Sequence, residues 1–128
     1  MTAWKGTPDA VSAAPVNPVG GGFAALGLTP VTGNFTANSQ QSASFTPVAG
    51  RPFNVSIWGT FSLTVQLERS FDSGTTWLQL TDNGTQIKKF TGSTVISESA
   101  TENEASGVLY RLSVTAYTSG TASYRLSQ

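Results

Sequence analysis

The sequence predicts an all-β fold, an antiparallel β-sandwich of jelly-roll or immunoglobulin-like kind with an extended N-terminal arm. Three observations predict it. Apolar side chains alternate with polar ones in several runs after Phe53, which is the two-residue period of half-buried strands. Turn-forming residues separate these runs roughly every 8 to 12 residues. No stretch shows the apolar period of about 3.6 residues that marks an amphipathic helix. The predicted division is an arm at 1–33 and a sandwich domain at 34–128.

The arm is predicted to be extended. It holds four of the six prolines and three consecutive glycines at 20–22, and Pro15 and Pro18 favour an extended backbone. No charged residue occurs from residue 10 to residue 50, whereas disordered tails are usually rich in charge and poor in apolar groups. We therefore expect the arm to lie along a neighbouring subunit, with packing on its own domain and disorder as alternatives. The expected partner-binding residues are Trp4, Val19, Phe23, Leu26 and Leu28.

Residues 34–50 are predicted to form an edge strand and a corner, because Pro47 has no N–H for a central strand. The core is predicted to begin with a strand at 53–58, in which Phe53, Val55 and Ile57 share one face. Gly59 and Thr60 are then predicted to form a turn. A second strand at 63–68 is expected to pair antiparallel with the first.

A tight turn is predicted at residues 70–77, whose spacing is S-x-D-x-G-x-T-W. An Asp carboxylate accepts backbone N–H groups two or three positions on, and a glycine adopts a positive φ without strain. A following Trp covers the turn with its ring. The predicted structural-turn residues are Ser70, Asp72, Gly74, Thr76 and Trp77.

The turn at 70–77 resembles the Asp-box, a β-hairpin turn that recurs in sialidases and other β-propellers. In that family the motif is a folding element remote from catalytic residues. The motif occurs once here, whereas a propeller needs several copies at a regular period. The resemblance therefore implies a structural turn, not a sialidase.

Shorter elements are predicted beyond this turn. Residues 77–80 are expected to pair back on the second core strand, and 82–84 is a strong turn signal. Short strands follow at 86–90 and 93–97, split by a glycine. The segment 98–107 contains Glu98, Glu102 and Glu104; we favour a solvated acidic loop over a calcium site, because the spacing fits no recognised calcium loop.

The chain is predicted to finish with two strands. The longer covers 107–117, a turn follows at 118–120, and the last strand covers 122–127. We expect Tyr110 and Tyr124 at the boundary of the core, with their hydroxyl groups reaching water or backbone.

The amino-acid composition limits the classes of function and partner that we expect. Seven basic and seven acidic residues give a formal net charge of zero, and only 11% of residues are charged, well below the roughly 25% of typical domains. We expect such a surface to be covered in an assembly, as a homo-dimer or trimer bound to other proteins. The sequence has no basic patch, so we expect no nucleic-acid partner. It also has no segment that would be expected to span a membrane or to act as a secretory signal. Cysteine and histidine are both absent, so we expect no cofactor, no thiolate and no imidazole chemistry.

Three segments resemble small β-domain structural proteins of tailed bacteriophages: residues 52–61, residues 67–77, and the ending from Leu109 to Leu126. The resemblance implies a virion component made in the host cytoplasm. The arm favours a capsid cement or decoration protein on the outer shell, bound to the major capsid protein, over a tail or baseplate component.

Two other functions are alternatives to a virion structural protein. A carbohydrate-binding module would use Trp58 or Tyr117, although packing of Trp58 under the arm or in a subunit contact is the favoured reading. A glycoside hydrolase would pair Glu68 with Asp72, but Asp72 is already assigned to the turn. We predict that the protein is not an enzyme.

Overall fold

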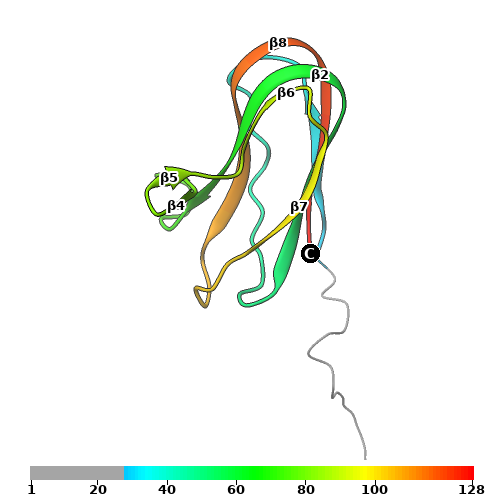
Figure 1. Cartoon of the computed structure of the whole chain (residues 1–128). Helices are drawn as coiled ribbons and strands as arrows, with labels where there is room; N and C mark the ends of the chain where they lie inside the picture. Colours follow the sequence, from blue (N-terminus) through cyan, green and yellow to red (C-terminus); the bar gives the residue numbers. More distant parts are fainter. Residues whose placement is uncertain (1–27) are drawn as a thin grey trace, which may run out of the picture.

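The computed structural model describes residues 28–128, which contain eight strands and no helix. The all-β prediction is confirmed, and every strand pairing is antiparallel (Figure 1). The strands are β1 (Val31–Phe35), β2 (Pro52–Ser70), β3 (Leu78–Gln79), β4 (Thr81–Asp82), β5 (Thr85–Gln86), β6 (Lys89–Gly92), β7 (Ile96–Thr101) and β8 (Leu109–Ser127).

The fold is built on one long pair of strands. β2 and β8 each span 19 residues and pair along nearly their whole length, from Asn54 opposite Ser127 to Ser70 opposite Leu109. Figure 1 shows the two strands arching over together at the top of the molecule. The predicted turns at 59–60 and 118–120 are therefore wrong, as is the pairing of 53–58 with 63–68. Both predicted turns are bends within continuous strands, and both halves of β2 pair with β8 instead.

Two glycines allow the bend. Gly59 has φ 123° and Gly120 has φ 86°, a region that other residues adopt only with strain. A Cβ on Gly59 would lie 2.6 Å from the Thr121 carbonyl oxygen, and one on Gly120 would collide with the Thr60 carbonyl oxygen. Each glycine thus lies against the backbone of the opposite strand.

Two register shifts follow the bend. β8 carries an extra residue between the partners of Ser62 and Leu63 and another between the partners of Thr64 and Val65. Such bulges increase the local bend and twist of a strand. The glycines and the bulges together fold one sheet into two limbs.

The other strands complete these limbs. In the first limb, β1 pairs with the end of β8, and β7 pairs with the start of β2. In the second limb, β3 and β6 pair with the end of β2. Residues 41–45 run beside β8 there and form isolated bridges to Ser113 and Tyr110.

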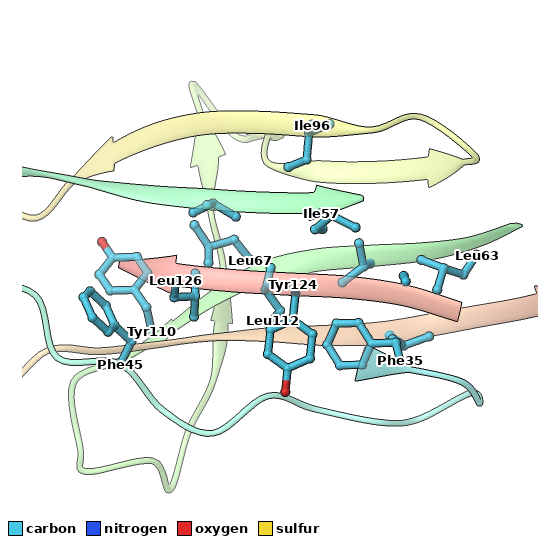
Figure 2. Close-up of a cluster of buried hydrophobic side chains, with 14 of the residues drawn as sticks. Phe35, Phe45, Ile57, Leu63, Leu67, Ile96, Tyr110, Leu112, Tyr124 and Leu126 are labelled. Carbon is cyan, nitrogen blue, oxygen red and sulfur yellow. The ribbon is translucent and has the colours of Figure 1, made fainter. Parts of the chain in front are cut away.

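The core fills the space between the limbs (Figure 2). Its side chains come from alternate positions, which confirms the predicted two-residue period. From β2 they are Phe53, Val55, Ile57, Phe61, Leu63, Val65 and Leu67, and from β8 they are Tyr110, Leu112, Val114, Ala122, Tyr124 and Leu126. The rings of Phe53 and Tyr110 join the limbs, with 4.7 Å between their centroids. Each large side chain buried in this way stabilises the fold by about 1.5–3 kcal/mol.

The smaller elements agree with the sequence in part. β3 pairs with β2 as predicted, and the turn at 82–84 joins β4 to β5. Asn83 and Gly84 both have positive φ, as a type I′ hairpin turn requires. β6 and β7 lie about three residues later than the strands predicted at 86–90 and 93–97.

The structure places the end of the predicted arm in the sheet. β1 begins at Val31, inside the range 1–33, and pairs with β8. Leu28 is partly buried and packs against the core of its own chain. Trp4, Val19, Phe23 and Leu26 lie outside the described residues.

The bend predicts an unequal response of two glycines to alanine. Gly120→Ala combines positive φ with the collision against Thr60, whereas Gly84→Ala keeps a similar φ of 80° with nothing within 4 Å of the new Cβ. We expect Gly84→Ala to cost about 1–2 kcal/mol of unfolding free energy. Gly120→Ala should cost at least about 1 kcal/mol more, through overpacking. Urea unfolding measures both, and equal losses would show that the close approach at the bend does not matter.

Candidate functional site

The predicted turn residues form a hydrogen-bonded turn at the end of β2. The buried Ser70 hydroxyl donates to Asp72 Oδ1 over 2.8 Å and accepts the Gly74 N–H over 2.9 Å. Asp72 Oδ1 also accepts the Thr76 N–H over 2.7 Å. The Asp72 carboxylate therefore accepts a backbone N–H four positions on, whereas the prediction was two or three positions. The N–H of Gly74, two positions after Asp72, is bound by Ser70 instead.

These contacts stabilise the ionised form of Asp72. The backbone N–H of Thr76, then the Thr76 and Ser70 hydroxyl groups, lower the pKa of Asp72 to about 2. Hydrogen bonds that favour the charged form of a carboxyl group have this effect.

Trp77 joins the turn to the outer face of the second limb. Its ring lies near Gly74, where a Cβ would be 3.4 Å from Trp77 Cζ2. The Arg111 guanidinium carbon is 4.3 Å from the Trp77 ring centroid. Arg111 Nε also donates to Glu68 Oε1 over 2.8 Å. The ring therefore covers a cross-strand ion pair, because Glu68 and Arg111 are direct partners in β2 and β8.

The carboxylates of the glycosidase hypothesis are held by separate donors. Glu68 is buried and accepts Gln66 Nε2 over 2.6 Å as well as Arg111. Gln66 in turn accepts Gln86 Nε2 over 3.0 Å. Asp72 serves the turn. Both groups thus have structural partners within the chain.

The expectation of a solvated acidic loop fails at Glu102, although Glu98 and Glu104 are exposed. It is only 5% exposed and accepts the Tyr110 hydroxyl over 2.8 Å and the Glu104 N–H over 2.8 Å. Arg69 Nη1 approaches it at 3.4 Å. Burial alone would raise the pKa of Glu102, but these donors and the Arg69 charge lower it below its ordinary value.

Tyr110 lies deeper than predicted. It is a fully buried core residue, and its hydroxyl donates to the Glu102 carboxylate instead of reaching water or backbone. Burial, followed by this hydrogen bond, raises the pKa of Tyr110 to about 12. Among residues 28–128, no group of three or more acidic side chains is placed to hold a metal ion.

An exposed apolar patch lies beside the turn, and we call it the Asp-box patch: Arg69, Phe71 and Leu78. Phe71 is 49% exposed and Leu78 is 46% exposed. The Arg69 guanidinium carbon lies 5.1 Å from the Phe71 ring centroid, and Leu78 is the direct partner of Arg69 in the β2–β3 pair. This patch was not predicted from the sequence, although Phe71 occupies an unconstrained position of the turn motif.

The two aromatic residues of the carbohydrate hypothesis are placed differently. Trp58 is 43% exposed on the first limb. Tyr117 is partly buried, and its hydroxyl donates to the Gly120 carbonyl over 2.8 Å at the bend. Trp58 is therefore the more accessible of the two rings.

Comparison with protein-family models, with curated proteins and with solved structures gave no match. Across the described residues there is no helix long and apolar enough to span a membrane.

The turn predicts a pH response. Because the folded pKa of Asp72 is about 2, below the ordinary 3.8, its stabilising effect is present above pH 3.8 and is lost as the pH falls through 2. Carboxyl NMR titration should find this low pKa. Ser70→Ala removes one donor and should move the pKa of Asp72 upward, while an unchanged pKa in that variant would contradict the role of Ser70.

The buried Tyr110–Glu102 contact predicts a stability difference between two tyrosines. Tyr110→Phe leaves a buried carboxylate short of one donor and should cost about 1–3 kcal/mol. Tyr117→Phe removes an exposed hydrogen bond and should cost less than about 1 kcal/mol.

The same contact predicts a loss at high pH. Because the pKa of Tyr110 is raised from 10 to about 12, its stabilising effect is present below pH 10 and disappears as the pH rises through 12. Urea unfolding from pH 7 to 12 tests this: Tyr117→Phe, which keeps Tyr110, should lose this stability as the pH rises, and Tyr110→Phe should not. Equal losses in the two variants would contradict it.

Proposed function

We propose that this chain is a non-enzymatic structural protein of a tailed-bacteriophage virion, a cement protein that binds the outer capsid shell through protein–protein contacts. The Asp-box patch carries the contact side of the proposal. It combines an arginine with two large apolar side chains that are nearly half exposed. Aromatic residues and arginine are enriched at protein interfaces and supply most of their binding energy. The virion context is supported by the resemblance of 52–61, 67–77 and the C-terminal strand region.

The patch is held in place before any partner binds. Arg69 is held on one side by Glu102 and on the other by the Phe71 ring. Phe71 lies between Ser70 and Asp72, whose side chains fix the turn. Side chains that are already ordered lose less conformational entropy on binding, so more of the contact energy appears as affinity.

On this proposal the two limbs are the layers of a β-sandwich of jelly-roll or immunoglobulin-like kind, and they form the rigid body of a clamp. The predicted arm at 1–33 reaches across a subunit boundary, since the 30 residues before β1 span up to about 100 Å when extended. Many copies on one lattice would multiply a weak contact through avidity. Self-association into dimers or trimers would fit the same surface, and a tail or baseplate position is the alternative location.

The proposal predicts that the patch governs attachment to particles. Purified particles stripped of the protein are incubated with the wild-type chain or with Phe71→Ala/Leu78→Ala, and binding is measured by co-sedimentation. We expect at least a tenfold loss for the double variant, because a buried aromatic anchor is worth about 2 kcal/mol or more and about 1.4 kcal/mol is tenfold.

Matched controls separate this effect from unfolding. Val48→Ala/Val95→Ala removes two exposed apolar side chains elsewhere and should leave binding unchanged. A chain without residues 2–27 keeps β1 and should stay folded while binding less tightly; equal binding would rule out the arm. Absence of the protein from purified particles, by mass spectrometry and imaging, would defeat the proposal.

A further inference from the structure

The outer face of the first limb is polar and almost uncharged. Its side chains come from the positions of β1, β2, β7 and β8 that alternate with the buried core. Nearly all of these outward positions carry serine, threonine or asparagine. Three residues differ: Pro52 at the start of β2, Trp58, which is 43% exposed, and Arg125, which is also exposed.

Hydrogen bonds fix the polar groups around Trp58. Ser123 is the direct partner of Trp58, and its hydroxyl donates to Asn34 Oδ1 over 2.9 Å. Ser56, two positions before Trp58 in β2, shares a 3.0 Å hydrogen bond with the Ser97 hydroxyl. A hydroxyl can donate once and accept twice, and an amide has further donors, so these groups keep hydrogen-bonding capacity for a ligand.

A single positive charge accompanies the ring. Arg125 is the direct partner of Ser56 in β2 and of Thr32 in β1. It is therefore diagonal to Trp58 across the β2–β8 pair, where backbone positions lie about 7–8 Å apart. The outward positions of the four strands in this limb contain no acidic residue. The face thus complements a partner that is polar and carries negative charge.

We propose that this face binds an acidic polysaccharide. The apolar C–H face of one pyranose ring stacks on the Trp58 indole, which offers a large amphipathic surface. The carboxylate of the same or the next sugar pairs with Arg125, whose planar guanidinium matches a carboxylate. The sugar hydroxyl groups hydrogen-bond with Ser56, Ser123 and Asn34. The inference goes beyond the proposed shell contact, because the Asp-box patch lies on the second limb.

Other partners fit the same face less well. The core of a protein interface is mostly apolar, whereas most of the outward residues around Trp58 are hydroxyl and amide side chains. Single-stranded nucleic acid would stack on an indole, but its phosphates need several cations and the outward positions here supply one. The polar surroundings and the single charge therefore favour a carboxylated sugar chain.

The experiment uses the full chain and an array of oligosaccharides that contain uronic acids, sialic acids or neutral sugars only. Oligogalacturonate and its methyl ester then serve as a matched pair in calorimetric titration. We expect binding to carboxylated glycans and at least tenfold weaker binding to the methyl ester. Trp58→Ala should abolish binding. Arg125→Gln should reduce the affinity for the acid to that for the ester. Phe71→Ala, which removes an exposed ring on the other limb, should leave glycan binding unchanged.

Several outcomes would overturn the inference. No binding to any carboxylated glycan excludes the site, and equal binding of acid and ester excludes the role of Arg125. Unchanged glycan binding by Trp58→Ala places the sugar elsewhere. Loss of shell attachment or self-association in Trp58→Ala without glycan binding identifies a protein interface instead, and binding of single-stranded DNA identifies a nucleic-acid face. Shell attachment is tested by Phe71→Ala/Leu78→Ala, so the two proposals fail separately.

Discussion

The pairing of β2 with β8 across a common bend is the constraint on which the structure depends. Both strands cross the bend without leaving the ladder, so the same pair supplies backbone hydrogen bonds to both limbs. The inward positions of β2 keep the same phase on each side of Gly59, which places Phe53 and Leu67 in one core. The backbones approach too closely at Gly59 and Gly120 for any side chain to fit between them.

The alternation of side chains predicted the strands and most of the core, but not how the strands connect. Gly59 followed by Thr60 has the composition of a turn, and only the unbroken odd-numbered phase from Phe53 to Leu67 indicated a single strand. If Gly59 and Thr60 formed a hairpin turn, the buried side chains before and after it would not need to keep the same odd-numbered pattern. The same ambiguity affected Gly120, because a glycine with positive φ serves turns and bends equally well.

The turn motif was recognisable because its residues are neighbours in the sequence. The contacts of Glu68 with Arg111 and of Tyr110 with Glu102 depend on strand register and loop path, which local patterns do not reveal. Glu102 lies in a polar stretch, so its burial had no sequence signal. The outward-facing polar residues beside Trp58 likewise come from four strands, and only the register brings them together.

The order of strands has a consequence for how the chain folds. β1 is the first strand of the described sequence, and its only strand partner is β8, which follows all the others. Few of the pairings that close the core are local, and topologies of this kind fold in roughly milliseconds to seconds because long loops must close first. Until β8 arrives, β1 and the start of β2 present open edges to other chains. Slow assembly at high concentration would therefore favour exchange of β1 between copies over closure within one chain.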